Sequence, residues 1–281
     1  MQGFAPAAGR RLACFVRAQP LGSVSSIRPY YGEYAWAYDL LTDRPVADEC
    51  EFICARLSHY GIRPPASVLD AGCGTGRYAI CLANSGYVVT GIDMSSALIA
   101  VANERRCSAS GALSLREDDI LTHSVSEPYD AVLCRGVLND FTESQDRAEA
   151  FEVFARALRP GGILILDVRE WAATVDRKTR QPIVEKRIIT TRGALSYWSS
   201  ARLDRTRQLL RITERHTLTS ERGENVSRYD FAMRCWTKDE LSINLLESGF
   251  VPLECFGGYD ALCDVGATDR LVVVAVHETA P

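Results

Sequence analysis

A chain of 281 residues, 47% of them hydrophobic, can bury a sizeable core and form one large domain or a domain with a substantial insertion. No apolar run reaches the roughly 18–20 residues of a membrane span, so the sequence excludes a helical membrane protein and predicts no membrane partner. A formal net charge of −4 argues against a general nucleic-acid binder.

The first 29 residues differ in composition from the rest of the chain. They contain four arginines and no acidic residue, as an organellar presequence can. They lack the continuous apolar stretch of a secretory signal. We expect residues 1–29 to be a poorly ordered leader, or the result of an over-long choice of start codon.

The ordered chain is expected to begin with an aromatic segment at residues 30–38, which holds four tyrosines and one tryptophan. A helix over Val46–Tyr60 follows, and Gly61 and the Pro64–Pro65 pair end it. This part of the chain precedes the first predicted strand.

Strands and helices then alternate. Strands are predicted over residues 67–70, 87–92, 112–116, 129–134, 163–168 and 270–276. Helices are predicted over residues 76–85, 95–106 and 145–158. Ser95 is placed to cap the second of these helices, and Gly161–Gly162 make the turn from the third into its strand. The alternation predicts an α/β fold with a doubly wound, mostly parallel sheet covered on both faces.

A late segment breaks this pattern. From about Ile183 to Cys235 the chain shows four β-rich runs separated by turn residues, which predict an antiparallel sheet. Between Lys178 and Trp236 it has 13 Lys or Arg against 6 Asp or Glu, which either attract an anionic substrate or form a solvated sheet face. We therefore expect one α/β domain from residues 30–177 and 237–281, and an inserted β lid at 178–236 that serves as a substrate or dimer element.

The ten cysteines show no metal-ligand spacing. Cys50 and Cys54 are four apart on a predicted helix, without a second pair or a histidine cluster nearby. Free thiols in a reducing cytoplasm are the default for such a pattern, so we expect a cytoplasmic protein without disulfides or a metal site.

The glycine-rich stretch at residues 68–76 carries the strongest chemical signal. A short apolar run ends in Asp70, three glycines alternate as G-x-G-x-G, and a second apolar run ends in Asp93, 17 residues after Gly76. Glycines let the backbone approach a ligand where a Cβ would clash. A dinucleotide enzyme has G-x-G-x-x-G, and an acid before the glycines suits a ligand with an amino group rather than a diphosphate. The pattern predicts a nucleoside-bearing cofactor.

The chain resembles the class I S-adenosylmethionine-dependent methyltransferases over roughly residues 30–276, in the small-molecule type with a late antiparallel insert. Five motifs of that family occur in order, at residues 68–76, Asp93, 118–120, 129–135 and 158–164. The resemblance implies a seven-stranded Rossmann-like sheet and S-adenosyl-L-methionine as the cofactor.

The same resemblance assigns the cofactor contacts. Asp93 would accept from both ribose hydroxyls, Asp119 from the adenine amino group, and residues 129–135 would run beside the methionine part. The implied cofactor-binding residues are Asp70, Gly72, Cys73, Gly74, Gly76, Asp93, Met94, Asp118, Asp119, Ile120, Cys134 and Arg135.

Candidate catalytic residues follow the fourth and fifth strands. Asn139 and Asp140 come directly after the fourth-strand motif, where they would orient a substrate or act as base, or else cap the next helix. Arg169 would pair with a substrate carboxylate, or else form an ion pair with Asp167 or Glu170.

Aromatic and histidine residues add two further expectations. Tyr31 and Tyr38 are the candidates for the pocket, because tyrosine rings and hydroxyl oxygens suit a sulfonium cation. None of the four histidines follows the fourth or fifth strand, which argues against chemistry that needs a histidine base.

Three functions remain compatible with the sequence. The favoured one is methylation of a small amine- or carboxylate-bearing metabolite in secondary metabolism. The first alternative is a cyclase or lyase reaction that closes the aminobutyrate part of S-adenosylmethionine to azetidine-2-carboxylate and releases methylthioadenosine. The second is a cofactor-binding partner subunit without catalysis. A small, anionic substrate is expected, nucleic acid is disfavoured, and a homodimer through the β insert fits the pattern. The acceptor atom and the oligomeric state stay open.

Overall fold

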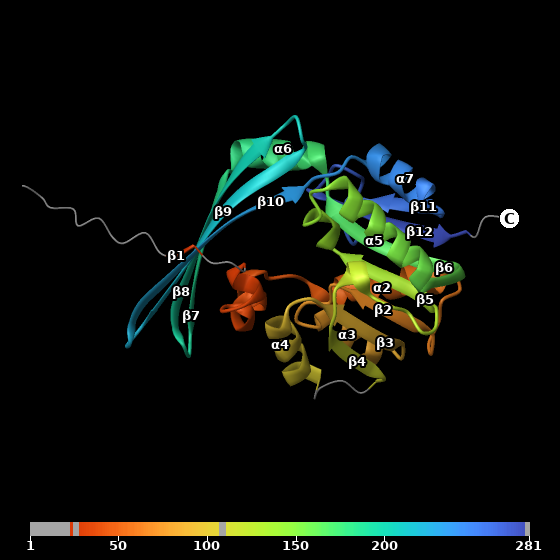
Figure 1. Ribbon diagram of the computed structural model, residues 1–281, viewed down its shortest axis with the longest axis horizontal. Coiled ribbons are helices and arrows are strands. Elements are labelled where there is room, and N and C mark those ends of the chain that lie inside the picture. Colours follow the sequence, from red (N-terminus) through yellow and green to blue (C-terminus); the bar gives the residue numbers. More distant parts are fainter. Residues whose placement is uncertain (1–22, 25–27, 107–110, 279–281) are drawn as a thin grey trace, which may run out of the picture.

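The computed structural model describes residues 23–24, 28–106 and 111–278 and contains two sheets (Figure 1). The larger sheet has seven strands in the order β11-β12-β6-β5-β2-β3-β4. Its strands are β2 (Ser67–Ala71), β3 (Val88–Asp93), β4 (Leu113–Glu117), β5 (Tyr129–Arg135), β6 (Leu158–Arg169), β11 (Phe250–Phe256) and β12 (Arg270–His277). β12 runs antiparallel to β6 and β11, and the other neighbours are parallel. This confirms the predicted α/β fold with a mostly parallel sheet.

Helices cover both faces of this sheet (Figure 1). They are α2 (Val46–His59), α3 (Arg77–Asn84), α4 (Ser96–Arg106), α5 (Ser144–Ala157) and α7 (Lys238–Glu247). Apolar side chains of α2, α3 and α4 share one buried cluster, and those of α5 and α7 share the other. Because both faces are buried, the central strands can be apolar along their whole length, as the sequence showed.

Local signals placed most boundaries within a few residues. Ser95 caps α4 as expected, since its hydroxyl accepts the Leu98 N–H at 3.0 Å. The predicted elements include neither α6 (Trp171–Arg180) nor β11. Pro252 obscured β11, and the structure tolerates this proline because β11 is an edge strand with an irregularity between Pro252 and Glu254.

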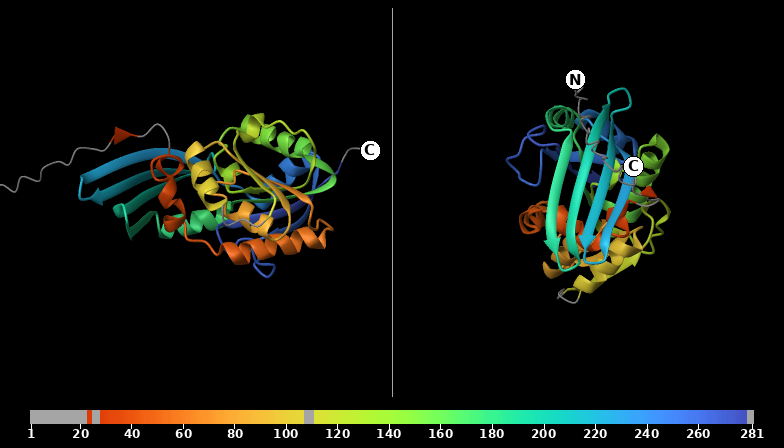
Figure 2. Two further views of the ribbon diagram at one scale, coloured as in Figure 1. Left: turned by 90° about the horizontal axis from the view of Figure 1, so that it is seen from below. Right: turned by 90° about the vertical axis from the view of Figure 1, so that its left-hand side faces the viewer.

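The smaller sheet has the order β1-β10-β9-β8-β7 and extends away from the larger one as long hairpins (Figure 2). Its strands are β1 (Ser23–Val24), β7 (Ile183–Thr190), β8 (Gly193–Asp204), β9 (Leu209–Ser220) and β10 (Gly223–Arg234). The four β-rich runs of residues 183–235 therefore form the expected antiparallel sheet. β1 lies within the predicted leader, of which residues 1–22 and 25–27 lie outside the described residues.

The aromatic segment packs between the two sheets. It folds into short helices: η1 (Pro29–Tyr31), η2 (Ala35–Ala37) and α1 (Tyr38–Leu41). Tyr30 and Tyr34 are buried in a small cluster with Leu195 of β8. His216 of β9 stacks on Tyr34 with ring centroids 5.3 Å apart, and burial lowers its pKa to about 4. This histidine is a neutral packing residue.

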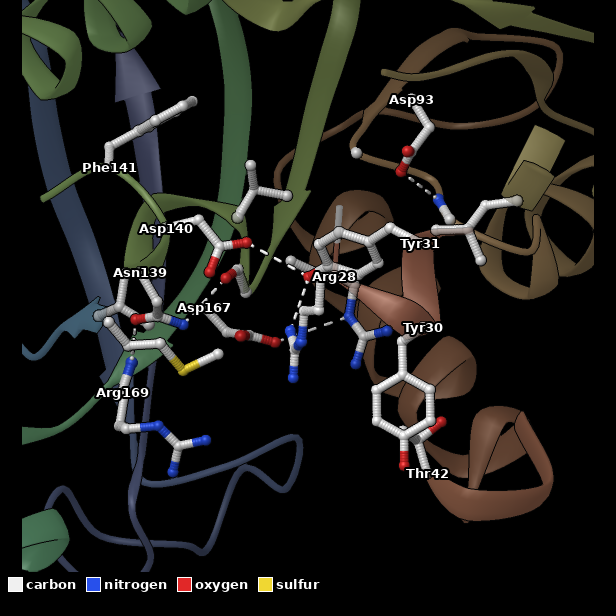
Figure 3. A pocket seen from close by; sticks show the side chains of 18 of the residues that line it. Arg28, Tyr30, Tyr31, Thr42, Asp93, Asn139, Asp140, Phe141, Asp167 and Arg169 are labelled. Atoms are coloured by element: carbon white, nitrogen blue, oxygen red, sulfur yellow. Dashed lines mark hydrogen bonds and ion pairs between the residues drawn. The ribbon is translucent and has the colours of Figure 1, made fainter. Parts of the chain in front are cut away.

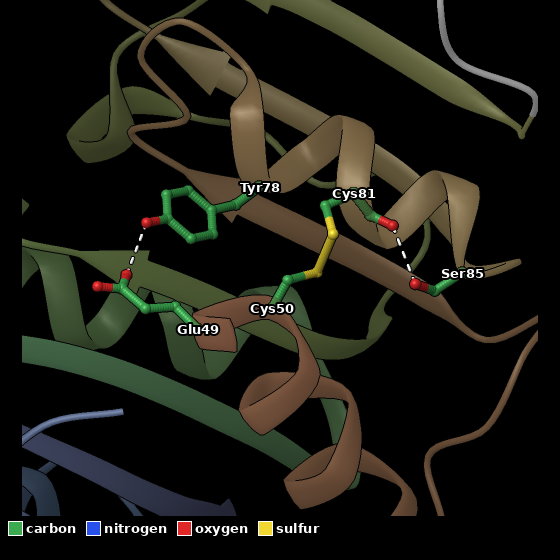
Figure 4. Close-up of a disulfide and its surroundings, with 5 residues drawn as sticks. All are labelled: Glu49, Cys50, Tyr78, Cys81 and Ser85. Atoms are coloured by element: carbon green, nitrogen blue, oxygen red, sulfur yellow. Dashed lines mark hydrogen bonds between the residues drawn. A yellow bond between two sulfur atoms is a disulfide. The ribbon is translucent and has the colours of Figure 1, made fainter. Parts of the chain in front are cut away.

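The expectation of free cysteines is wrong for one pair. Cys50 of α2 and Cys81 of α3 form a disulfide (Figure 4). The two helices pack side by side, which brings the Cα atoms to 6.6 Å across a sequence separation of 31 residues. Sequence spacing carries no trace of this contact, because tertiary packing creates it. The described free cysteines are Cys54, Cys73, Cys134, Cys235, Cys255 and Cys263.

The described residues form neither a membrane-spanning helix nor a metal-binding cluster. No helix in residues 23–24, 28–106 and 111–278 is long and apolar enough to cross a membrane. Within the same ranges, no three His, Cys, Asp or Glu side chains are grouped to hold a metal ion.

Candidate active site

A cavity of about 320 Å³ lies at the carboxyl ends of the parallel strands (Figure 3), where open α/β sheets bind ligands. Its wall combines the aromatic segment, the glycine-rich loop after β2, the ends of β5 and β6, and the start of β12. Met233 of β10 adds a side chain from the smaller sheet. The β insert thus contributes directly to the cavity.

Most residues predicted for the site line this cavity. They are Tyr31, Tyr38, Gly72, Gly74, Asp93, Met94, Asp119, Ile120, Arg135, Asn139, Asp140 and Arg169. The cavity wall does not include the predicted Asp70, Cys73, Gly76, Asp118 and Cys134.

The glycine-rich loop depends on backbone angles that other residues rarely adopt. Gly72, Gly74 and Gly76 have φ values of +80°, +55° and +74°. A Cβ on Gly72 would collide with the side chain of Val137, whereas a Cβ on Gly74 would meet nothing within 4 Å. The loop therefore needs a glycine at Gly72 for packing, and at Gly74 its backbone stays open to a ligand.

Asp93 holds this loop from the end of β3. Its Oδ2 accepts the Gly74 N–H at 2.9 Å, and its Oδ1 accepts the Ser95 N–H at 2.9 Å. Burial raises the pKa of Asp93, and these two hydrogen bonds oppose the rise. Each carboxylate oxygen keeps a lone pair for a ligand hydroxyl.

Asp70 of β2, which precedes the glycine-rich loop, is a buried acid with an incomplete set of hydrogen bonds among the described residues. It is 2% exposed, and its Oδ2 is buried without a hydrogen-bond partner among the described residues. Burial raises its pKa to about 7. Asp70 does not line the cavity, so it would act on a ligand there through its charge, which favours a cationic group such as the amino group of the methionine part.

The end of the cavity that is predicted to hold adenine is lined by apolar side chains and one acid. Met94, which is 73% exposed, lines the cavity together with Ile120 and Asp119. Asp118 is engaged elsewhere, since its Oδ2 lies 2.8 Å from the Nδ1 of His123. Asp119, whose Oδ1 accepts the Leu121 N–H at 3.0 Å, is the one of these two neighbouring acids that lines the cavity.

The two cysteines that were predicted to bind the cofactor contribute no side chain to the cavity. Cys73 is buried in the cluster of α2, α3 and α4, and Cys134 in the cluster of α5 and α7. Burial raises the pKa of both thiols, so both are protonated packing residues at neutral pH. Only their backbone could meet a ligand.

A chain of polar groups crosses the cavity wall from the insert to the end of β5. Glu214 of β9 accepts from Arg28 at 2.8 and 3.1 Å, and Arg28 donates to the Tyr31 hydroxyl at 2.9 Å. That hydroxyl donates to Asp140 Oδ2 at 3.3 Å (Figure 3). The guanidinium of Arg28 also lies 4.3 Å from the ring centroid of Phe231 in β10. These contacts tie the aromatic segment and the insert to Asp140.

Two opposing effects act on the pKa of Asp140. Burial raises the pKa of its carboxyl group, while the charge of Arg28 and the hydrogen bond from Tyr31 lower it. Neither Asp140 nor its neighbour Asn139 caps α5, because the residue at that N-cap is Glu143. The capping alternative for this pair is therefore wrong.

Asn139 is a brace between two strands. Its Nδ2 donates to the Gly136 carbonyl at 2.9 Å, and its Oδ1 accepts the Arg169 N–H at 2.8 Å. The carboxamide is occupied by backbone groups. Its position favours a role in holding the loop before Asp140 and the end of β6.

Arg169 lines the cavity but does not pair with the acids expected from the sequence. Its guanidinium binds Asp269, which also accepts from Arg177 at 2.5 Å. Glu170 instead caps α6, accepting the Ala173 N–H at 2.6 Å. The expected pairing of Arg169 with a neighbour in the sequence is wrong.

A second arginine cluster lies beside the glycine loop. Asp167, at the end of β6, pairs with Arg270 at 2.6 Å and lies 3.7 Å from Arg135. Tyr259 donates to Asp167 at 2.6 Å and accepts from Arg135 at 2.7 Å. Arg135 also binds Glu49 of α2. These charges keep the pKa of Asp167 below its usual range although burial opposes this.

Several cavity residues could not be found from the sequence. Arg28 lies in the segment expected to be a leader, and Met233 lies in the insert. Asp269 and Arg270 follow β6 by about a hundred residues and reach the cavity only because β12 pairs with β6. The one available signal was the position of Arg28 directly before the aromatic segment.

Comparisons with known proteins agree with this geometry. A family model described as "Methyltransferase domain" matches residues 68–162. Putative methyltransferase YqeM of Bacillus subtilis is 34% identical over 140 residues, which are 49% of this chain and 55% of that protein. A glycine/sarcosine N-methyltransferase of Aphanothece halophytica is 33% identical over 135 residues, covering 46% of this chain and 49% of that protein. The chain thus spans about half the length of these curated relatives.

Solved structures match over most of the chain. A S-adenosylmethionine-dependent methyltransferase from Clostridium acetobutylicum has a TM-score of 0.73 at 16% identity, covering 89% of this chain and 99% of that one. The sugar N-methyltransferase KedS8 from Streptoalloteichus has a TM-score of 0.72 at 20% identity, covering 99% and 100%. Residues 68–162 thus match the methyltransferase-domain model, and the chain has the fold of the class I S-adenosylmethionine-dependent methyltransferases.

Proposed function

We propose that this protein transfers a methyl group from S-adenosylmethionine to the amine of a small molecule. S-adenosylmethionine is the cofactor of the family. The observation that carries the proposal is the Arg28–Tyr31–Asp140 chain, which ends in a carboxylate on the wall of the cofactor cavity. A carboxylate in this position suits an ammonium group that must lose a proton before it can act as a nucleophile.

The residues that would hold the cofactor follow the length of the cavity. The open backbone at Gly74, with the charge of the buried Asp70 close by in the chain, suits the methionine part. Asp93 suits the ribose, and Met94 with Asp119 suits the adenine. When bound, S-adenosylmethionine supplies an electrophilic methyl group on a sulfonium. The protein then has to exclude water, align the acceptor nitrogen and remove one proton.

Asp140 is the proposed general base. Its carboxylate would take the proton that leaves the acceptor ammonium. The freed electron pair of nitrogen would then form the N–C bond as the bond between sulfur and the methyl group breaks, with S-adenosylhomocysteine as the leaving group. Arg28 and Tyr31 favour the ionised form of Asp140, since their interactions lower its pKa against the larger effect of burial. Asn139 is proposed as a positioning residue, because its amide groups bind backbone.

The β insert is proposed as the lid of the site. It supplies Glu214, which is 1% exposed and anchors Arg28, and Met233, which lines the cavity. Both contacts lie on the side of the smaller sheet that faces the aromatic segment. A homodimer through this insert remains a prediction.

Product analysis tests the proposal. The purified protein is incubated with methyl-labelled S-adenosylmethionine, with and without a panel of small primary and secondary amines. Transfer of label to an amine, with S-adenosylhomocysteine formed in equal amount, is the expected result. Methylthioadenosine formed without any acceptor would contradict methyl transfer and favour cyclisation. Cofactor binding without any product over the whole panel would favour a non-catalytic partner subunit.

Replacing Asp93 by alanine should weaken cofactor binding by about 100-fold, because it removes two ribose acceptors and the brace on Gly74. Isothermal titration with S-adenosylhomocysteine measures this. Asp230→Ala, an exposed acid on the smaller sheet away from the cavity, is the control and should bind normally. Unchanged affinity of the Asp93 variant would refute the ribose assignment.

A further inference from the structure

We infer that the acceptor also carries a carboxylate, which binds at the end of the cavity formed by Arg169 and Arg270. This inference rests on the proposed function and extends it to a substrate class, the small amino-carboxylates. Both side chains line the cavity. In Figure 3, Arg169 and Asp93 lie at different ends of the site, so Arg169 is separate from the expected position of the ribose.

The first argument is a pair of like charges in direct register. Arg270 of β12 lies opposite Arg169 of β6 in the antiparallel ladder. Directly opposed residues of such strands project from the same face with Cβ atoms about 5 Å apart, and like charges there are destabilising. The repulsion between the two arginines lies at the cavity, where an anion bound between the two guanidinium groups would offset it.

The second argument is the local charge balance. Asp269 is shared by Arg169 and Arg177, and Asp167 by Arg270 and Arg135. Glu49 binds Arg135 and lies 4.0 Å from Arg44, which also lines the cavity. Five guanidinium groups therefore face three carboxylates. Positive groups therefore outnumber negative ones in this local network of ion pairs, which suits an anion.

The third argument is the fixed position of Arg169 with unused donor capacity. Its backbone N–H binds Asn139, and its carbonyl accepts the Trp236 N–H at 2.8 Å. Asp269 holds one end of the guanidinium, while its Nε is buried without a partner among the described residues. A held guanidinium with a free donor is suited to bind a planar carboxylate.

The two ends of the proposed acceptor site are linked by one residue. Asn139 immediately precedes Asp140 and accepts from the backbone of Arg169, so the base and the arginine are held in a constant relation. A small molecule with an amine at Asp140 and a carboxylate at Arg169 would satisfy both. This polarity favours amino-carboxylates over amines without an acid group.

A binding experiment tests the inference without catalysis. The protein is saturated with S-adenosylhomocysteine and titrated calorimetrically with 4-aminobutyrate, butyrate, butylamine and inorganic phosphate. 4-Aminobutyrate should bind most tightly. Arg169→Gln should weaken binding of 4-aminobutyrate and butyrate by about tenfold or more and leave butylamine unchanged. Arg177→Gln is the matched control: Arg177 shares Asp269 but does not line the cavity, so affinities should change by less than about twofold.

Each other outcome has a defined meaning. If Arg169→Gln weakens S-adenosylhomocysteine instead, the arginine serves the cofactor and the inference is wrong. Tighter binding of phosphate than of either carboxylate, equal effects of the two variants, or no binding of any carboxylate to the wild type would also overturn it. Failure of methyl transfer is recorded separately, by product analysis, and does not alter these affinities.

Discussion

Replacing Asp140 by asparagine should lower kcat for an amine acceptor by about 100-fold or more, the usual contribution of a general base. Asparagine keeps the size of the side chain but cannot accept the proton. In the wild type, kcat should rise with pH as Asp140 ionises and then level off. Because burial raises the pKa of Asp140, this rise should lie above the usual range of a carboxyl group. The variant should lack that limb of the pH profile.

Tyr31→Phe tests the hydrogen bond to Asp140 separately from the proposed base itself. The Tyr31 hydroxyl donates to Asp140 and lowers its pKa, so its removal should move the limb to higher pH with a smaller loss of kcat. Unchanged affinity for S-adenosylhomocysteine and an unchanged melting temperature are the controls for both variants. An Asp140→Asn enzyme with more than half of the wild-type kcat would exclude Asp140 as the base.

Replacing Asp70 by asparagine should stabilise the cofactor-free protein while weakening cofactor binding about tenfold or more. The folded state raises the pKa of Asp70 to about 7, whereas an unfolded aspartate titrates near 4. The folded protein therefore binds the extra proton between these values, and its free energy of unfolding falls as pH rises through that window. Above about pH 7 the whole penalty is present.

Unfolding by urea at pH 5 and pH 8 measures this effect. Asparagine carries no charge, so the gain in the free energy of unfolding should be larger at pH 8. At about 1.4 kcal/mol per pKa unit, the gain is bounded by about 4 kcal/mol. Calorimetry with S-adenosylhomocysteine gives the loss of affinity. A gain that is equal at both pH values would show that Asp70 is not a buried, ionisable group paired with the cofactor.

At the predicted cofactor end of the cavity, residues that lie close together in the sequence could be assigned to the site from the sequence alone. Gly72, Gly74 and Asp93 lie at strand ends, and parallel strands bring their carboxyl ends to one edge. The choice of Asp119 over Asp118 also agrees with the cavity wall. The sequence did not predict the direction of each side chain. Successive side chains of a strand point to opposite faces, so Cys134 of β5 lies in the core while Arg135 reaches the cavity.

The acceptor end could not be placed in the same way. Arg28 and Arg270 are separated by most of the chain, and the partner of Arg169 lies a hundred residues away. Sequence distance carries no information about such contacts, since strand pairing and the docking of the aromatic segment on the insert create them. The disulfide between Cys50 and Cys81 arose in the same way, from two packed helices.

The sequence by itself determined the α/β fold and the inserted antiparallel sheet, because both depend on local periodicity, and its family motifs implied the cofactor, because they are short runs of neighbouring residues. Only the tertiary structure decided which charged side chains meet at the acceptor end. Charge pairing there depends on the register of β12 against β6 and on the buried contact of Arg28 with Glu214. Those contacts are long-range, so they exist only once the sheets and the aromatic segment have packed together.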